Sequence, residues 1–120
     1  MKTKIILLLI CLLLVSSSTA LAFSKDVKGG DFEYDNTSIR RRDGYAVLFG
    51  EMTNETGKDY ELVKFTVNFY NWSEELINSE PLYIENFNDD QTKSFEVSLF
   101  EEDEYEDIDD FKIQFEGGIR

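Results

Sequence analysis

The sequence from Glu61 to Trp72 is ELVKFTVNFYNW, and this stretch decides the fold class. Val63, Phe65, Val67 and Phe69 alternate in it with polar residues. Successive side chains of a β-strand point to opposite faces of the sheet, so the pattern predicts a strand with one face in the core. No part of the chain beyond residue 22 shows helical periodicity over three turns, and alternation dominates instead.

Similar runs, bounded by turn residues such as Asp43-Gly44, occur on both sides of this stretch. They predict strands over residues 32–40, 45–53, 76–85, 92–100 and 111–115. Pro81, the only proline, marks the 76–85 strand as an edge strand. Gly117-Gly118 is expected to end the last strand. Short strands at this spacing predict an all-β fold, an immunoglobulin-like antiparallel β-sandwich of about six to seven strands.

The first 22 residues differ from the rest of the chain. Lys2 and Lys4 precede an unbroken apolar run from Ile5 to Val15, and Ala20-Leu-Ala22 follows. A basic start, a short apolar run and a small-x-small ending are typical of a secretory signal peptide, so we expect cleavage after Ala22. A retained anchor is the alternative, although the apolar run is about half of the ~20 residues that a spanning helix needs.

This division predicts a signal peptide over residues 1–22, a polar leader over 23–31 and one β-sandwich domain over 32–120. The mature chain of 98 residues is long enough for one hydrophobic core. The only cysteine, Cys11, leaves with the signal peptide, so packing alone must stabilise the domain. We expect a secreted, extracytoplasmic protein, and association with the cell surface stays open.

The chain is strongly acidic. Its formal net charge is −13, and loss of the two lysines of the signal peptide lowers it to −15. Such a surface repels nucleic acid and anionic lipid head groups, whereas it suits cations and cationic partners. All 10 Phe, 6 Tyr and 1 Trp lie after residue 22, and that aromatic density argues against disorder.

The composition also argues against catalysis. The chain contains no His, and its mature part contains no Cys, so the commonest general base and the thiol nucleophile are absent. No nucleophile-elbow or Ser-x-x-Lys pattern is present. We therefore predict that the protein is not an enzyme, that it has no catalytic residues and that it needs no organic cofactor.

An acidic segment over residues 101–110 holds eight carboxylates in ten residues. Ca²⁺ takes six to eight oxygen ligands and would relieve their repulsion, which makes this segment a candidate calcium site. Its candidate ligands are Asp103, Asp107, Asp109 and Asp110. The segment lacks the central glycine and the spacing of an EF-hand loop. The alternative is a solvated loop between the last two strands.

Three aromatic residues, Tyr60, Tyr70 and Trp72, fall on the polar side of the 61–72 strand or at its ends. An exposed aromatic cluster there is a candidate face for binding sugar or protein. The alternative is a second buried face covered by neighbouring chain.

Three N-x-S/T sequons begin at Asn36, Asn54 and Asn71. All three lie at or near predicted turns, where a glycan could attach. The alternative interpretation is that Asn54 and Asn71 form turns by bonding the local backbone.

Several of these segments resemble FxLYD-type domains, which are small immunoglobulin-like β modules of secreted and surface proteins. Gly50-Glu-Met-Thr-Asn54 is similar to the family's G-x-V-x-N strand and turn, and the naming motif corresponds to residues 67–71. Residues 84–87, 91–92 and 95–97 resemble the turn and strand that follow in the family. The resemblance covers about residues 47–97.

The pattern departs from the family at several positions: Val67 stands in place of Phe, Asn71 in place of Asp, Met52 in place of Val, and Asp89-Asp90 in place of Pro-Gly. The resemblance implies a sandwich fold and says little about activity, because fold does not fix function.

Together these observations predict a secreted, non-catalytic binding or structural module that contacts a protein or another cell-surface component. No nucleic-acid partner and no membrane insertion after signal cleavage are expected. A calcium-dependent adhesion or surface-layer accessory domain that uses residues 101–110 is one alternative. An inhibitor of an extracellular hydrolase is another.

Overall fold

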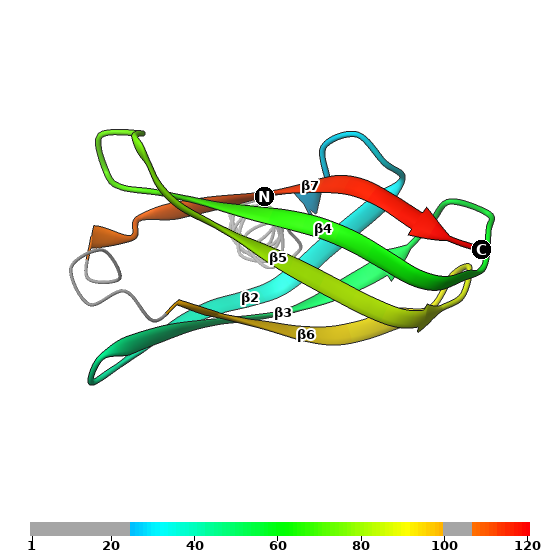
Figure 1. Cartoon of the computed structure of the whole chain (residues 1–120), viewed down its shortest axis with the longest axis horizontal. Coiled ribbons are helices and arrows are strands. Elements are labelled where there is room, and N and C mark those ends of the chain that lie inside the picture. Colours follow the sequence, from blue (N-terminus) through cyan, green and yellow to red (C-terminus); the bar gives the residue numbers. More distant parts are fainter. Residues whose placement is uncertain (1–24, 100–106) are drawn as a thin grey trace, which may run out of the picture.

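The computed structural model describes residues 25–99 and 107–120. Within these residues the chain forms seven strands in two layers (Figure 1). Their bounds are β1 (Lys25–Asp26), β2 (Phe32–Arg42), β3 (Tyr45–Asn54), β4 (Tyr60–Tyr70), β5 (Leu76–Phe87), β6 (Thr92–Leu99) and β7 (Asp110–Ile119).

The strands form two antiparallel sheets that pack face to face. Sheet A has the order β1-β2-β3-β6, and sheet B has the order β5-β4-β7. The chain changes sheet between β3 and β4, between β5 and β6, and between β6 and β7. Apart from β1, the orders β2-β3-β6 and β5-β4-β7 correspond to strands A-B-E and C′-C-F of an immunoglobulin sandwich. The predicted all-β sandwich is confirmed, and the expected signal peptide lies outside the described residues.

The core lies between the two sheets, with β4 at its centre. Val63, Phe65, Val67 and Phe69 are fully buried, as the alternation predicted. Phe32 of sheet A meets Phe65 edge-on, with ring centroids 5.0 Å apart. Such aromatic contacts between layers contribute about 0.5–1.5 kcal/mol beyond the burial of apolar area.

Residues 25–28, expected to belong to a polar leader, are part of the fold. Lys25 and Asp26 pair with β2, and Val27 is buried in the core. The Lys28 N–H donates to the Ile113 carbonyl at 3.0 Å, and the Lys28 carbonyl accepts from the Phe115 N–H at 2.9 Å. This segment therefore joins sheet A to the outer edge of β7. A single apolar residue between charged neighbours gave no alternation from which the strand could be predicted.

The expectation that Gly117-Gly118 ends the last strand is wrong, because β7 continues to Ile119. Lys64 pairs with Gly117 while Phe65 pairs with Phe115, so Glu116 is the extra residue of a β-bulge. Gly117 has a φ of 151°, a conformation that side chains disfavour. A Cβ on Gly118 would lie 2.5 Å from the Tyr60 ring, so this glycine permits close packing.

Candidate binding face on sheet B

Large apolar side chains that face solvent are distributed unevenly between the two sheets. In residues 25–99 and 107–120 they all belong to sheet B or to its β4–β5 connection: Trp72 at 80% exposure, Ile119 at 59%, Leu76 at 58% and Tyr83 at 55%. The described part of sheet A presents none of comparable exposure. Sheet B is therefore the apolar side of the molecular surface.

The outer face of sheet B follows from the register of β4. Because its odd-numbered residues fill the core, Leu62 and Lys64 lie on the outside. Leu62 is opposite Glu85 on β5 and Ile119 on β7, and Lys64 is opposite Tyr83. Two of the exposed apolar residues, Tyr83 and Ile119, thus lie beside the half-buried Leu62.

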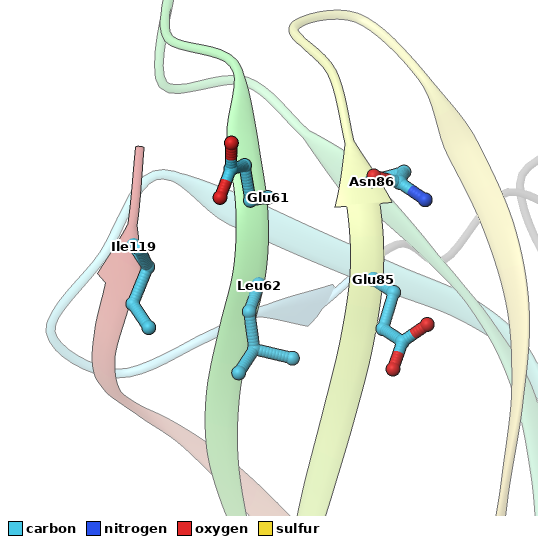
Figure 2. Close-up of a pocket in the computed structure, with 5 residues that line it drawn as sticks. All are labelled: Glu61, Leu62, Glu85, Asn86 and Ile119. Atoms are coloured by element: carbon cyan, nitrogen blue, oxygen red, sulfur yellow. The ribbon is translucent and has the colours of Figure 1, made fainter.

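A hollow of about 290 Å³ lies there, lined by Glu61, Leu62, Glu85, Asn86 and Ile119. We call it the Leu62 hollow. Figure 2 shows its side chains arriving from β7, β4 and β5, with Leu62 on the central strand. Its floor is therefore apolar, and Glu61 and Glu85 provide carboxylates beside it.

A second hollow of about 280 Å³ continues from this floor and adds Lys64, Tyr83 and Glu116 to its lining. The Lys64 ammonium lies 5.9 Å from the centre of the Tyr83 ring, in a cation–π arrangement. The Gln114 side chain donates a hydrogen bond to Glu116 and lowers the pKa of that carboxyl. Glu116 therefore keeps its negative charge to a lower pH than an isolated glutamate.

At the other end of sheet B, a hollow of about 250 Å³ brings together the end of β4, the β4–β5 connection and the start of β7. We call it the Trp72 hollow, and its lining residues are Tyr70, Asn71, Trp72, Glu74, Asp109, Asp110 and Lys112. Tyr70 pairs with Asp110 across β4 and β7, and its carbonyl accepts from the Asp109 N–H at 2.9 Å.

The turn after β4 determines where Trp72 lies. The Asn71 side-chain oxygen accepts hydrogen bonds from the N–H groups of Ser73 and Glu75, both at 3.0 Å. Glu74 takes a positive φ of 62° to close the turn. Trp72 therefore lies beyond the end of β4, in the turn and largely in solvent, rather than inside the strand that was predicted to include it.

The electrostatics of the Trp72 hollow favour a cation. Three carboxylates line it, against one lysine. The Lys112 ammonium lies 5.3 Å from the centre of the Tyr70 ring. The negative charge of Asp110 also acts on Tyr34 of sheet A, which lies outside this hollow. Burial raises the pKa of the Tyr34 hydroxyl, and Asp110 raises it further.

Three of the four candidate calcium ligands fall in the described residues, and Asp103 falls outside them. Asp109 and Asp110 both line the Trp72 hollow, whereas Asp107 does not. Across 25–99 and 107–120, no three acidic, His or Cys side chains are grouped so as to hold a metal ion. Calcium binding by residues 101–110 stays a proposal.

The C-terminal part of the acidic segment is packed. Ile108 is buried, and its carbonyl accepts a hydrogen bond from the Arg41 guanidinium at 2.7 Å. These contacts fix the position of Asp109 and Asp110 at the start of β7.

The structure brings together only two of the three candidate aromatic residues. Tyr70 and Trp72 share the Trp72 hollow, whereas Tyr60 begins β4 ten residues earlier. At ~3.4 Å per residue the two ends of this strand are roughly 34 Å apart. Tyr60 instead packs against the core, with its ring centroid 6.2 Å from that of Phe32.

The three sequons differ in accessibility. Asn36 is exposed, at an irregularity of β2 where its φ is 51°. Asn54 is fully buried, and its side-chain nitrogen donates to the carbonyls of Lys58 and Phe87. That nitrogen is the atom to which a glycan attaches, so the folded turn has no room for one at Asn54. Glycosylation of Asn36 or Asn71 stays a proposal.

Four residues of this face were not predicted from the sequence: Leu62, Tyr83, Ile119 and Lys112. Tyr83 alternates with the buried Leu82 and Ile84, and this signal could have identified it as an outward aromatic residue. Ile119 gave no such signal, because it follows the two glycines that were expected to end the strand.

Comparison with known proteins adds little. No family model matches the chain, and no curated protein resembles it in sequence. A crystal structure of a DUF1425 family member from Shewanella sp. pv-4 is 10% identical, with a TM-score of 0.48, over 81% of this chain and 89% of that chain. Similarity at this level carries no inference about function. We also find no helix in the described ranges with the length and hydropathy that a membrane crossing requires.

Proposed function

We propose that this protein is a secreted, non-catalytic binding module whose sheet B contacts a protein component of the cell surface. One observation carries the proposal: every strongly exposed large apolar side chain of the described residues lies on sheet B or its β4–β5 connection. Contiguous exposed apolar surface on a soluble protein marks an interaction site, and Leu62, Tyr83 and Ile119 line one such continuous hollow on this face. Aromatic residues such as Tyr83 and Trp72 are the types that dominate binding energy at protein interfaces.

The proposal includes membership of the FxLYD-type domains. It is supported by the roles of two motif residues. Gly50 lies beneath the Phe95 ring, where a Cβ would be 2.6 Å from the nearest ring atom. Asn54 holds the turn after β3 through four hydrogen bonds. Both are structural roles, so the resemblance supports a scaffold and leaves the ligand to the surface of sheet B.

Export is proposed from residues 1–22, and N-terminal sequencing of the protein recovered outside the cell tests it. The expected first residue is Phe23, because Ala20 and Ala22 satisfy the small-residue rule of signal peptidase. Recovery of an intact Met1 in the membrane fraction would favour the retained anchor.

Binding is tested with labelled mature protein and intact cells of the organism that produces it. Wild-type protein is expected to bind saturably. A Tyr83→Ser/Ile119→Ser variant is expected to bind at least about tenfold more weakly, because truncating an interface aromatic commonly costs more than about 1 kcal/mol.

The matched control is Thr92→Ser/Glu96→Ser, which changes two exposed residues of sheet A. It should bind like the wild type, and both variants should melt as cooperatively as the parent. Undiminished binding by the sheet B variant, or equal loss in both variants, would contradict the proposal.

A calcium-dependent adhesion domain is the second candidate function. It rests on the eight carboxylates of residues 101–110, two of which, Asp109 and Asp110, line the Trp72 hollow. Carboxylate oxygens are the ligands that Ca²⁺ prefers.

A further inference from the structure

The Trp72 hollow has the size of a site for one side chain. Its volume of about 250 Å³ is smaller than the ~300–1,000 Å³ of pockets that enclose whole small molecules. It is lined by an indole that is 80% exposed and therefore presents open aromatic surface. A flat group inserted from a partner would fit such a site better than a free metabolite.

The charges of the hollow select a cationic group. Glu74, Asp109 and Asp110 outnumber the single Lys112, which leaves a net charge of −2 among the lining residues. The Lys112 ammonium lies over the Tyr70 ring, so one aromatic residue of this hollow already makes a cation–π contact. The same arrangement recurs on sheet B, where Lys64 lies over Tyr83 beside the acidic Leu62 hollow.

The combination of side chains favours a planar organic cation, because carboxylates line one hollow together with the exposed indole of Trp72. A guanidinium group spreads five N–H donors over a plane, pairs with carboxylates in a fork and stacks on aromatic rings. An ammonium group offers only a compact point charge and makes no planar stack.

We infer that the Trp72 hollow binds the guanidinium group of an arginine side chain, stacked on Trp72 and paired with the carboxylates of Asp109 and Asp110. The arginine belongs to the protein partner that sheet B contacts, so this inference rests on the proposed function. The partner segment is therefore basic at one end of sheet B and apolar at the other, where it meets Leu62 and Ile119.

Trp72 is the only tryptophan in the chain, so its fluorescence reports directly on this hollow. The probe is N-acetyl-arginine amide, added to the mature protein. Two control probes are N-acetyl-lysine amide, which keeps the charge without the plane, and N-acetyl-citrulline amide, which keeps the shape without the charge. A saturable fluorescence change is expected for arginine, a weaker one for lysine and none for citrulline.

Two charge-matched variants separate the site from the general acidity of the protein. Asp109→Asn/Asp110→Asn removes two charges from the hollow. Asp89→Asn/Asp90→Asn removes two charges from the β5–β6 turn, where a side-chain oxygen at position 89 still accepts the hydrogen bond from Gly57 N–H. We expect the dissociation constant for the arginine probe to rise at least about tenfold in the first variant and less than about twofold in the second.

Amide chemical shifts should locate the probe independently of Trp72. Saturable shifts are expected at Tyr70, Trp72 and residues 109–112. Equal weakening in both charge variants, equal binding of citrulline, or lysine binding as tight as arginine would overturn the inference.

Failure of this inference and of the proposed function have different signatures. Tyr83→Ser/Ile119→Ser should leave binding of the arginine probe unchanged, because these residues lie outside the Trp72 hollow. If the protein binds the cell surface but the Trp72 hollow does not bind the arginine probe, the inference alone is overturned. Arginine binding by a protein that does not bind the cell surface overturns the proposed function.

Discussion

Asn54 and Asn71 play the same local role, since each lies where a strand ends and uses its side-chain oxygen to hold a turn. Their surroundings differ. Asn54 is fully buried, and all four hydrogen bonds that its amide can make are formed, with Thr56 N–H and hydroxyl as donors and the carbonyls of Lys58 and Phe87 as acceptors. Asn71 is only partly buried, and within the described part of the chain its side chain makes hydrogen bonds through the oxygen alone.

This contrast predicts different costs of truncation. Asn54→Ala should lower the free energy of unfolding by about 2–3 kcal/mol, because four hydrogen bonds are lost and the buried carbonyl of Phe87 loses this donor. Asn71→Ala should lower it by less than about 1 kcal/mol, since water replaces the lost contacts. Urea denaturation of both variants measures the difference. Equal losses in the free energy of unfolding would show that the burial of Asn54 does not determine its contribution to stability.

The alternation of β4 predicts a second residue-level contrast. Phe65→Ala should cost about 3–5 kcal/mol, because it removes a fully buried ring and leaves a cavity. Lys64→Ala should cost less than about 1 kcal/mol, because the lysine is exposed and loses only surface interactions, with the Tyr83 ring and the Glu116 carboxylate. Thermal or urea denaturation decides between them, and similar losses at both positions would mean that the register of β4 is wrong.

Residue-level prediction from the sequence worked for β4 because the two faces of a strand alternate strictly. The same rule could not separate Tyr60 from Tyr70, which have the same parity. Tyr60 leaves the outer face because the strand end turns its ring toward Phe32 and over Gly118. Such a departure depends on a glycine far away in the sequence, which local patterning cannot reveal.

At the level of strands, turn residues predicted most boundaries, and the exceptions have specific causes. Asn86 has a φ of 50°, and after it Phe87 enters the core, which extends β5 past its predicted end at Glu85. Gly117 and Gly118 continue β7 through a bulge instead of ending it. Asparagine and glycine mark both turns and irregular strands, so composition alone does not distinguish the two.

The close packing at the end of β7 can be tested. Gly118→Ala should destabilise the protein by about 1–3 kcal/mol, because its Cβ would collide with the Tyr60 ring. In a Tyr60→Ser background the same substitution should cost clearly less, since the colliding ring is absent. A double-mutant cycle measured by denaturation gives this coupling. If the free-energy costs of the two substitutions are additive, the clash is with the neighbouring backbone and not with the Tyr60 ring.

For the whole molecule, the candidate site depends on topology that the sequence did not reveal. The acidic segment and the aromatic residues were considered separately, because Trp72 and Asp109 are far apart in the chain. They share one hollow because β7 pairs with β4, which places Asp110 opposite Tyr70. The residue types of the site were visible in the sequence, but their convergence required the order β5-β4-β7.

At the scale of the whole molecule, calcium could change the stability of the fold in two ways: by screening charges or by binding at a site. Eight carboxylates over residues 101–110 repel one another, and any salt should relieve this repulsion by screening. A true site would instead stabilise the fold by RT ln(1 + [Ca²⁺]/Kd), ~2.7 kcal/mol at a hundredfold excess over Kd, which is a rise in Tm of roughly 10 °C or more for a domain of this size.

We expect millimolar CaCl₂ to raise the Tm of the mature protein modestly, and NaCl of equal ionic strength and MgCl₂ to raise it equally. The reason is that runs of like charge are usually solvated, so that any salt relieves their repulsion by screening. Differential scanning calorimetry of the wild type and of Asp107→Asn/Asp109→Asn/Asp110→Asn measures these shifts in Tm.

A large shift in Tm that is specific for Ca²⁺ over Mg²⁺ and disappears in the triple variant would identify a bound ion, because Mg²⁺ dehydrates reluctantly and demands octahedral geometry. That result would make calcium-dependent adhesion the better account of the acidic segment.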